Sequence, residues 1–439
     1  MSAQSLHSWG HYPPFPQTAH ACHWRAELAG TRDALVHRYG STLAFGNGRS
    51  YGDSCLAASD QVLHLRALDR FLHADWSRGV LTAEAGVTLD EILALAIPRG
   101  WFLSVTPGTQ FVTLGGAIAN DVHGKNHHVR GTFGCHVRRL SLLRSQEGRQ
   151  LCSPDEQADL FAATIGGLGL TGIIEWAEIQ LTPIASSQID CLVERFDTLA
   201  DFFTLSAELD QQHEFCVAWI DCAATGARSG RGVYLAGDFA PDGGLKVATK
   251  AALSVPLTSP LSLINGLSLR VFNEYYWRKH PPTRQHQRSD YMPFFYPLDG
   301  VHHWNRIYGP KGFQQYQCLI PDAQAQPAMQ ALLDAIAASG RGSFLAVLKR
   351  CGAVASPGWL SFPAPGTTLA LDFPQSRALV ETLFPRLNAI VREAGGRLYP
   401  AKDAQMIGED FRRSYPAWQH LEAWRDPALG SRFWTRVTT

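Results

Sequence analysis

Apolar residues in the first 183 positions recur in patterns typical of short strands separated by glycine-rich turns. Residues 41–45 (STLAF) and 80–86 (VLTAEAG) predict strands. Residues 171–182 (TGIIEWAEIQLT) contain the apolar and polar alternation of a half-buried strand. This part of the chain is therefore expected to build a sheet whose strands are joined by turns.

Helical spacing appears at three places. Thr88 and Glu91 form a T-x-x-E capping box, and the helix that it starts is expected to close at Pro98 and Gly100. Further on, Met329, Leu332, Leu333 and Ile336 predict a helix near 325–338. A third helix is predicted near 376–394, where apolar residues form one stripe that ends at Gly395-Gly396.

The pattern changes at Pro183, where we place a domain boundary. Beyond it the sequence predicts strands at 188–196, 215–222, 232–236, 316–320, 344–349, 368–373 and 397–399. The later order βαββαβ indicates an antiparallel sheet with helices on one face. Residues 255–270 (PLTSPLSLINGLSLRV) are apolar but broken by Pro, Asn and Gly, so we expect a mobile surface segment there rather than a long helix. The whole pattern is typical of an α+β protein of two domains.

Composition narrows the class of protein. The 439 residues are 45% hydrophobic and only 18% charged, which argues against disorder. Lys and Arg together number 39, as do Asp and Glu, so the formal net charge of +0 argues against a nucleic-acid partner. No apolar run is long enough for a transmembrane helix, and the N-terminus carries no secretory pattern. We expect a cytoplasmic protein with at most peripheral membrane contact.

Nine cysteines occur at scattered spacings: Cys22, Cys55, Cys135, Cys152, Cys191, Cys216, Cys222, Cys318 and Cys351. Their number is odd and no CxxC pair is present, so a zinc ribbon or a disulfide framework is not expected. Reduced thiols are the simplest interpretation.

The first strand leads into a glycine-rich loop, Gly46-Asn47-Gly48-Arg49-Ser50-Tyr51-Gly52. The glycine spacing is one residue too long for a dinucleotide fingerprint of the βαβ type, and no amphipathic helix follows. Glycines here permit positive φ and leave several N–H groups free to point one way, as in an anion-binding nest. A plain turn and a phosphate loop both remain open.

Two further segments are rich in small residues. After the turn Pro107-Gly108-Thr109, residues 113–120 (TLGGAIAN) predict a helix whose first turn is free of bulky side chains, which suits a phosphate or, alternatively, close helix–sheet packing. Residues 166–174 (GGLGLTGII) form another glycine-dense turn before a strand. Three such loops favour a long ligand held mainly by main chain, and a dinucleotide meets that description.

The segment His123-Gly124-Lys125-Asn126-His127-His128 carries the densest cluster of chemistry-bearing residues. Two histidines four positions apart raise the question of a metal site. Only Asp121 is near enough to complete a ligand set, and nothing supports it, so no metal is predicted. Packed or exposed histidines are one alternative; a polar active-site floor, with Lys125 meeting an anion and His123 near the reacting centre, is the other.

At these residues the chain resembles the flavoprotein oxidases of the vanillyl-alcohol-oxidase type. The strings GNGRSYGDSCL, TPGTQFVTLGGAIANDVHGKNHHVRGTFGCHV and TIGGLGLTGIIEWAEIQLTP carry the resemblance. It continues through HHWNRIYGPKGFQQYQCLIP, SFLAVLKRCG, LALDFP and GGRLYPAKDAQ, from about residue 10 to about residue 425. Within this family the likeness is greatest to the decaprenylphosphoryl-ribose 2′-oxidase group, which forms the flavin half of a two-enzyme epimerase.

The resemblance implies a PCMH-type FAD-binding domain of two subdomains (1–183), a substrate domain (184–396) and a C-terminal segment (397–439) that completes the FAD domain. It implies non-covalent FAD held by Gly46, Asn47, Gly48, Arg49, Ser50, Tyr51, Gly52, Pro107, Gly108, Thr109, Thr113, Gly115, Gly116, Ala119, Asn120, His123, Gly124, Asn126, His127, Gly167, Gly169, Gly172, Ile173, Tyr399 and Lys402. Substrate-binding residues carried over by position are Lys125, Tyr308, Gln315, Gln317 and Lys349. Catalytic roles fall to Lys402, His123 and Tyr51.

The pattern departs from the family at two places. A cysteine that often stands over the flavin is replaced by Ala370, and a nearby asparagine by Thr368. Inhibitors that bond to that thiol are therefore expected to fail on this protein. Related alditol oxidases tether their flavin through a histidine in the first glycine loop, where this chain has Arg49. This is why we expect the flavin to be bound without a covalent link.

The expected reaction is oxidation of a secondary sugar hydroxyl to a ketone, with hydride transfer to flavin N5 beside the fixed cation of Lys402. The implied substrate is a polyprenyl-phosphate sugar, and the implied partner is an NAD(P)H-dependent short-chain reductase. Two alternatives stay open at this point: an oxidase or dehydrogenase of a soluble sugar, alditol or glycoside, and a flavin-binding protein without turnover. The sequence assigns neither the proton acceptor nor the electron acceptor.

Overall fold

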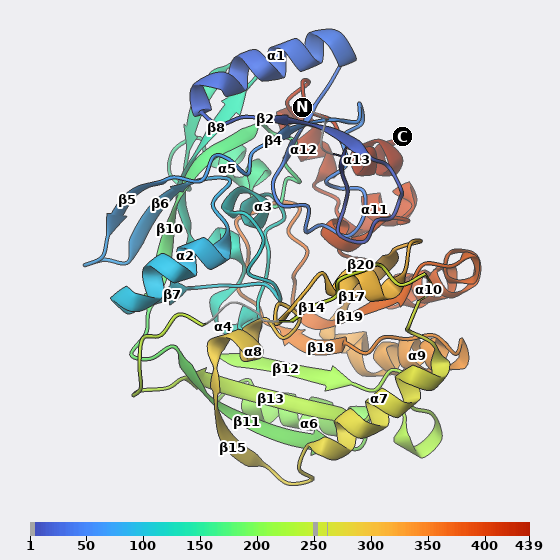
Figure 1. Cartoon of the computed structure of the whole chain (residues 1–439). Coiled ribbons are helices and arrows are strands. Elements are labelled where there is room, and N and C mark those ends of the chain that lie inside the picture. Colours follow the sequence, from blue (N-terminus) through green and yellow to red (C-terminus); the bar gives the residue numbers. More distant parts are fainter. Residues whose placement is uncertain (1–4, 249–252, 261) are drawn as a thin grey trace.

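The computed structural model describes residues 5–248, 253–260 and 262–439. The first four residues of the predicted N-terminal domain, and one position of the 255–270 segment, lie outside this range. Figure 1 shows two bodies, one built from the N-terminal part of the chain together with its C-terminal helices, and one built from the middle. The mixture of helices with largely antiparallel sheets confirms the predicted α+β class.

The N-terminal body begins with a four-stranded sheet of order β1-β2-β4-β3. Strands β2, β4 and β3 are parallel, and helix α1 (Leu28–Tyr39) makes the connection between β2 and β3. The strands are β1 (Ser5–Leu6), β2 (Gln17–Ala21), β3 (Leu43–Phe45) and β4 (Gln61–His64). Because β3 ends at Phe45, the glycine-rich loop starts at the carboxyl edge of this sheet, where ligands of open α/β sheets bind.

The second sheet of this body has the order β5-β6-β10-β8-β9, with β7 paired to β10. Its strands are β5 (Phe71–Asp75), β6 (Val80–Glu84), β7 (Trp101–Leu103), β8 (Val137–Arg144), β9 (Gly148–Cys152) and β10 (Ile173–Pro183). Its helices are α2 (Leu89–Ala96), α3 (Leu114–Ala119), α4 (His127–Arg130) and α5 (Ala158–Thr164). Helix α2 starts at the predicted capping box, where Glu91 Oε2 accepts from the Thr88 N–H at 2.8 Å.

The middle body is an eight-stranded antiparallel sheet of order β15-β11-β13-β12-β18-β19-β17-β20. Its strands are β11 (Gln188–Phe196), β12 (Phe215–Ile220), β13 (Gly232–Phe239), β15 (Gln285–Asp290), β17 (Phe313–Ile320), β18 (Ala346–Cys351), β19 (Gly366–Pro374) and β20 (Arg397–Leu398). Helices α6 (Leu199–Leu209), α9 (Ala325–Ala338) and α10 (Phe384–Glu393) pack their apolar residues into one core with these strands. The opposite face of strands β17, β18 and β19 is thereby left to face the N-terminal body.

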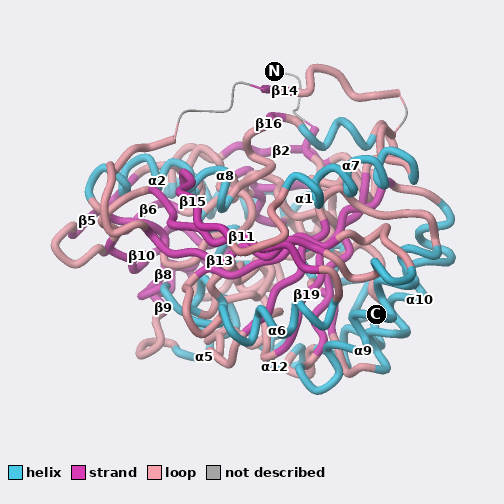
Figure 2. The backbone as a smooth tube through the Cα atoms, turned by 90° about the horizontal axis from the view of Figure 1, so that it is seen from below, coloured by secondary structure: helices cyan, strands magenta, loops and turns pink. Residues whose placement is uncertain are grey.

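Smaller elements lie at the edge of the middle body. They are β14 (Leu253–Ser254), α7 (Gly266–Lys279), α8 (Tyr291–Phe295) and β16 (Val301–His302), and β14 pairs with β16 in parallel. Seen from below in Figure 2, β14 stands out from the body.

The last part of the chain returns to the N-terminal body as helices α11 (Gly408–Ser414), α12 (Trp418–Trp424) and α13 (Arg432–Thr438). Isolated bridges join Thr42 to Leu429 and Ala57 to Ser431. The Arg436 guanidinium binds Asp53 at 2.7 Å and Asp403 at 2.9 Å. Chain ends that are far apart in sequence therefore hold one body together.

One expectation from the sequence is wrong in part. Residues 255–270 were expected to avoid helix, but α7 begins at Gly266 and runs for 14 residues. The reason is a cap that the prediction overlooked: Asn265 Oδ1 accepts from the N–H groups of Leu267 and Ser268. In addition, the strand predicted at 397–399 is present as β20, which pairs with β17 at the edge of the middle sheet.

Candidate active site

A cavity of about 450 Å³ lies between the two bodies and is lined by both of them. This volume is within the range of small-molecule and cofactor sites. The predicted site residues that line it are Gly46, Asn47, Gly48, Arg49, Ser50, Tyr51, Pro107, Gly108, Thr109, Thr113, Gly115, Gly116, Ala119, Asn120, His123, Gly124, Lys125, Gly169, Gly172, Gln315, Gln317, Lys349, Tyr399 and Lys402. Residues from both ends of the chain thus meet around one space.

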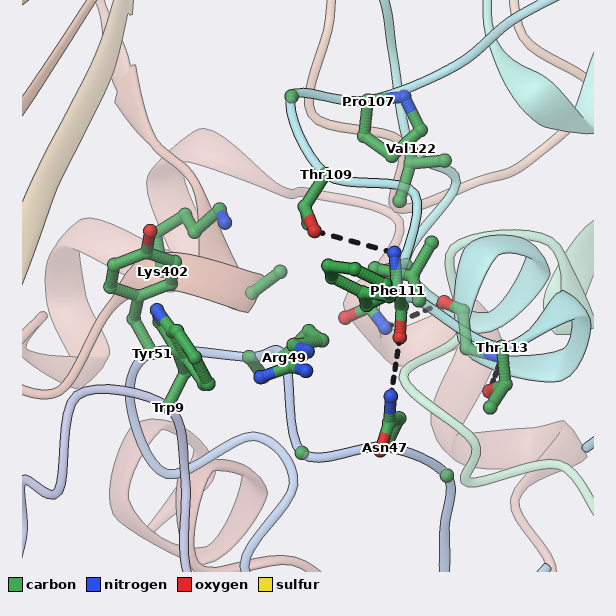
Figure 3. A pocket seen from close by; sticks show the side chains of 18 of the residues that line it. Trp9, Asn47, Arg49, Tyr51, Pro107, Thr109, Phe111, Thr113, Val122 and Lys402 are labelled. Atoms are coloured by element: carbon green, nitrogen blue, oxygen red, sulfur yellow. Dashed lines mark hydrogen bonds between the residues drawn. The ribbon is translucent and has the colours of Figure 1, made fainter. Parts of the chain in front are cut away.

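The N-terminal wall is built from main chain held at close range. Asn47 Nδ2 donates to the Phe111 carbonyl at 2.7 Å, which ties the first glycine loop to the second (Figure 3). A Cβ on Gly46 would lie 2.4 Å from Thr113 Oγ1, so only glycine fits there. The N–H groups of Asn47, Arg49 and Ser50 donate no hydrogen bond within the described part of the chain. They remain available to a ligand.

Arg49 is the most conspicuous side chain of this wall. Its guanidinium carbon lies 4.1 Å from the Trp9 ring centroid and 5.5 Å from that of Phe111, between the two rings in Figure 3. Burial lowers the pKa of Arg49 from its ordinary value. The buried Arg49 Nε and Ser54 Oγ have no hydrogen-bond partner among the described residues. Unpaired donors in a lined cavity indicate an anionic or strongly accepting ligand.

The start of helix α3 supplies the second main-chain surface. Thr113 caps the helix by accepting from the Gly116 N–H at 3.2 Å. A Cβ on Gly115 would approach the Cβ of Ala85 to 2.9 Å, so this glycine also serves close packing on β6. By contrast, a Cβ on Gly108 or Gly169 would meet nothing within 4 Å, so a side chain at either position would take up ligand space.

The wall on the middle body follows from strand register. Gln315 of β17 pairs with Asp372 of β19, and Gln317 pairs with Ala370. Lys349 of β18 pairs with Thr368. Because alternate residues of a strand share a face, these side chains all lie on the face that lines the cavity. The predicted shared face of Gln315 and Gln317 is therefore present.

Lys349, His123 and Gln317 form a hydrogen-bonded chain across the cavity floor. Lys349 Nζ lies 2.6 Å from His123 Nδ1 and also donates to the Gly124 carbonyl. Gln317 Nε2 lies 3.2 Å from His123 Nε2. Burial, reinforced by the Lys349 charge, holds the pKa of His123 well below its ordinary value. The imidazole is therefore neutral at neutral pH, with Lys349 beside Nδ1 and Gln317 beside Nε2.

Lys402, Tyr51 and Asp372 occupy the other end of the same wall. Lys402 Nζ lies 4.1 Å from the Tyr51 ring centroid, and both side chains are seen in Figure 3. Burial lowers the pKa of Lys402 to about 8 and raises that of Asp372 to about 7, and each charge favours the other. Gln315 Nε2 donates to Asp372 Oδ1 at 2.7 Å. Burial raises the pKa of Tyr51 well above its ordinary value, so the phenol keeps its proton.

The cavity carries an excess of basic groups. Burial and the neighbouring Lys349 lower the pKa of Lys125 to about 8, and burial also lowers the pKa of Lys349. Within the described residues, neither lysine nor Lys402 forms an ion pair with a carboxylate. An anion entering the cavity would stabilise the charged form of each lysine. The electrostatics thus favour a ligand that brings phosphate or develops negative charge.

Six predicted site residues lie off the cavity. Gly52 packs against the Asp403 carbonyl, and Gly167 against that of Ala163. Asn126 Nδ2 donates to the Ser104 carbonyl, while His127 Nδ1 accepts from the Gly352 N–H. Ile173 is fully buried, and the next residue of β10, Ile174, lines the cavity instead. Tyr308 stacks on Phe313 with 4.2 Å between ring centroids and supports the wall from behind.

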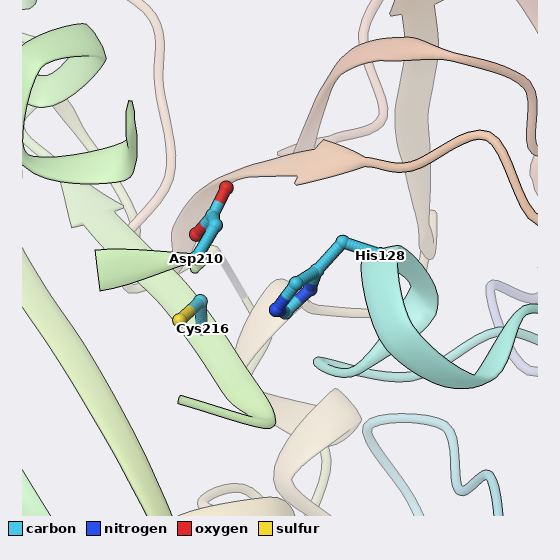
Figure 4. Close-up of side chains that lie close together, drawn as sticks. All are labelled: His128, Asp210 and Cys216. Atoms are coloured by element: carbon cyan, nitrogen blue, oxygen red, sulfur yellow. The ribbon is translucent and has the colours of Figure 1, made fainter. Parts of the chain in front are cut away.

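The histidine cluster does not converge on one point. The ring centroids of His123 and His127 are 6.5 Å apart, and His128 Nε2 bonds to the His213 carbonyl at 3.0 Å. His128 instead approaches Asp210 and Cys216, with ligand atoms within 4.8 Å of one another (Figure 4). Asp210 already accepts from the Tyr234 hydroxyl at 2.6 Å and from Ser206 at 2.7 Å. Burial and Asp210 raise the pKa of the Cys216 thiol. These contacts describe a hydrogen-bond network with a protonated thiol.

Several lining residues were not predicted from the sequence. Asp372 lines the wall between Gln315 and Lys402, and Trp9, Phe111, Asp299 and Trp304 close other sides of the cavity. The period-two spacing of Thr368, Ala370 and Asp372 was a usable signal once Gln315 and Gln317 were placed. Trp9 and Trp304 come from segments without a pattern that points inward.

Comparison with known proteins identifies FAD as the cofactor. A family model described as an FAD binding domain matches residues 26–153. The decaprenylphosphoryl-beta-D-ribose oxidase of Mycolicibacterium smegmatis is 35% identical over 385 residues, covering 85% of this chain and 83% of that protein.

This chain belongs to the FAD-dependent decaprenylphosphoryl-ribose oxidase family.

Two further relatives extend the comparison. An uncharacterized protein encoded in the mprA 5′ region of Streptomyces coelicolor is 32% identical over 361 residues, covering 78% of this chain and 96% of the relative. Mouse L-gulonolactone oxidase is 30% identical over 139 residues, 31% of each chain. The matches confirm the predicted class, an FAD-dependent oxidoreductase acting on CH–OH groups.

The residues of this oxidase fit FAD. The free N–H groups and the unpartnered Arg49 Nε and Ser54 Oγ suit the pyrophosphate, which prefers glycine-rich main chain and cationic donors. Lys402, a lysine that lines the same cavity, would favour negative charge on a bound flavin ring. No described helix is long and apolar enough to cross a membrane.

Proposed function

We propose that the protein oxidises a secondary hydroxyl of a polyprenyl-phosphate-linked sugar, at the 2′ position of a ribose unit, as the first half of an epimerisation. The observation that carries this proposal is the lining of the cavity, which brings Lys125 of the N-terminal body together with Lys349, Gln315 and Gln317 of the middle body. Lysines suit a phosphate and amides suit sugar hydroxyls. The relative of known activity is named as an oxidase of such a substrate.

In this proposal each residue has a separate role. Lys125 and Lys349 bind the phosphate, and Gln315 and Gln317 orient the ribose. Bound FAD supplies the hydride acceptor. Lys402 stabilises the negative charge that hydride transfer brings into the site.

The hydroxyl proton requires an acceptor, and we assign it to Asp372. A general base is most effective when its pKa is near the working pH, and that of Asp372 is raised by burial to about 7. His123 is a weak base because burial and the Lys349 charge depress its pKa, so we assign it the role of positioning Gln317 and Lys349. Tyr51 keeps its proton and borders Lys402, where it excludes water.

The product ketone would be returned as the epimeric alcohol by a separate NAD(P)H-dependent short-chain reductase. The protein is then one half of a two-enzyme sequence, and an electron acceptor regenerates the oxidised enzyme.

The test is anaerobic substrate screening of the purified yellow protein, read as loss of flavin absorbance. A short-chain polyprenyl phosphoribose is expected to bleach the flavin, whereas free ribose, alditols and glycosides are not. Equal bleaching by a free sugar would replace the proposal with oxidation of a soluble sugar. If no compound reduces the flavin, the protein binds FAD without turnover on these substrates.

A further inference from the structure

The largest concentration of exposed apolar side chains lies on one segment beside the cavity. Six residues form what we term the apolar ridge, with exposures of 58–79%: Leu253, Leu257, Leu263, Leu267, Val271 and Tyr275. Isolated exposed apolar residues need no explanation, but a contiguous set usually marks an interaction site.

The ridge on α7 is an amphipathic stripe whose other face is firmly anchored. Leu267, Val271 and Tyr275 recur every four residues and therefore share a face. On the opposite face Leu269 is buried, and Asn273 Nδ2 donates to Asp221 Oδ1 at 2.7 Å. The helix is thus packed in place by its inner side while its outer side carries apolar groups into solvent.

The N-terminal part of the ridge is fastened along the rim of the cavity. Strand β14 pairs with β16, and Val301 and His302 of β16 line the cavity. Arg306 Nη1 donates to the carbonyls of Val255 and Pro256 at 2.9 and 2.8 Å. In Figure 2 this segment stands out from the edge of the body where β16 also lies. The N-terminal part of the ridge therefore lies beside residues that line the cavity.

The charges around the ridge are mainly basic. Residues 253–260 and 262–280 contain Arg270, Arg278 and Lys279 against a single acid, Glu274. Glu274 is paired with Arg231 at 2.7 Å and with Arg278 at 2.6 Å. Arg270 and Lys279, which flank the stripe, form no ion pair within the described residues. Apolar side chains bordered by unpaired cations are the pattern of a helix that lies in a membrane interface and attracts anionic lipid.

We propose that the apolar ridge seats the protein on an anionic lipid surface, so that the cavity opens at the membrane. The inference rests on the proposed function, because a polyprenyl-phosphate sugar has its head group at such a surface. The ridge immerses its leucines, Val271 and Tyr275 in the interface while Arg270 and Lys279 meet lipid phosphates. The sugar phosphate then reaches Lys125 and Lys349 while its chain stays among the lipids.

The experiment is vesicle co-sedimentation of the full-length holoprotein. Vesicles of phosphatidylcholine mixed with phosphatidylglycerol are compared with vesicles of phosphatidylcholine alone. The wild-type protein is expected to bind the anionic vesicles more strongly. The double variant Leu267→Asp, Val271→Asp is expected to lose at least about tenfold in partitioning. The variants Arg270→Gln and Lys279→Gln are each expected to lose about fivefold, on anionic vesicles only.

The matched control is Phe71→Asp, Leu72→Asp on β5, which puts two acids on an exposed apolar pair far from the ridge. It is expected to bind like wild type. Equal binding by the ridge and control variants, or no binding by wild type, overturns the proposal. A wild-type dimer that the ridge variant converts to monomer also overturns it, because the surface is then an interface between copies of the chain.

A second measurement separates this inference from the proposed function. Both variants are assayed for flavin reduction by a water-soluble short-chain phosphoribose without vesicles, and the ridge variant is expected to match wild type. Vesicle binding without any flavin reduction refutes the proposed function and leaves the ridge standing. A ridge variant that binds no vesicles but also fails to reduce its flavin overturns the assignment of the ridge to lipid alone.

Discussion

Replacement of Lys402 by methionine removes one buried cation while keeping the shape of the side chain. Lys402 lines the cavity, with its Nζ 4.1 Å from the Tyr51 ring centroid. A unit charge about 4 Å from developing negative charge contributes about 4 kcal/mol at an effective dielectric constant of about 20. Asp372 nearby offsets part of this. We therefore expect Lys402→Met to lower the rate of flavin reduction by about 10²–10³, the loss seen when one donor at a developing anion is removed.

The measurement is anaerobic rapid-mixing reduction of the bound flavin at saturating substrate, with FAD content determined on the same sample. A second readout is the two-electron potential of the bound flavin, which should become more negative by about 60–90 mV for the same free energy. Lys311→Met serves as control because Lys311 is exposed. A potential within about 10 mV of wild type, with FAD fully bound, would refute the role of Lys402 as the stabilising cation.

The same residue gives a pH dependence with a definite sign. Burial lowers the pKa of Lys402 to about 8, so in the flavin-free protein the cation is present below about pH 8 and lost above it. Because folding lowers the pKa of Lys402, its buried charge destabilises the folded protein below about pH 8. This stability is regained as the pH rises from about 8 toward the ordinary lysine pKa. FAD affinity should therefore fall as pH rises through about 8 in wild type, and fall less steeply in Lys402→Met, where only Lys125 of this pair still titrates near pH 8. A level profile in wild type contradicts this reasoning.

Three further outcomes follow from the cavity walls. Gly46→Ala should lower FAD occupancy, measured as the flavin-to-protein absorbance ratio, because its Cβ would lie 2.4 Å from Thr113 Oγ1, whereas Gly30→Ala, which meets nothing within 4 Å, should not. Asp372→Asn should reduce kcat by about 10²–10⁴ with FAD still bound, and should abolish the rise of activity with pH near 7 that a carboxylate base with a raised pKa produces. Acid precipitation should release the yellow colour into solution, because Arg49 stands where a tethering histidine would be; colour retained on the pellet contradicts non-covalent binding.

The sequence predicted those helices whose buried apolar residues recur at a regular helical spacing. The helix expected near 325–338 is α9 (Ala325–Ala338), because four buried apolar residues recur at helical spacing. The α7 helix was missed because Asn265, which caps its start, was taken as a break in the apolar segment. Helix α1 was also not predicted. Its buried residues are only Leu28, Arg32 and Leu35, which are too few to give a helical pattern of apolar positions.

The candidate site also contains residues that the sequence predicted and residues that it did not. The glycine loops could be predicted because a close approach of the main chain requires small residues, which the sequence shows directly. The other candidate site residues were carried over from the family resemblance. The place of Asp372 in the cavity was not predicted. It lies beside Gln315 because β17 pairs with β19, and these strands are far apart in the sequence. Tyr308 was expected in the pocket, but the stacking that puts it behind Phe313 is a tertiary contact with no signal in the sequence.

The two walls of the cavity come from different parts of the chain and present different groups. The N-terminal wall presents main-chain N–H groups and glycines, several of which leave no room for a side chain. The wall of β17, β18 and β19 presents every second side chain, so a change at Thr368 or Ala370 alters one spot and leaves the register intact. We therefore expect substitutions at Thr368 or Ala370 to alter substrate selection without displacing the flavin. The replacement of the family cysteine by Ala370, between Gln317 and Val347, is a change of this kind.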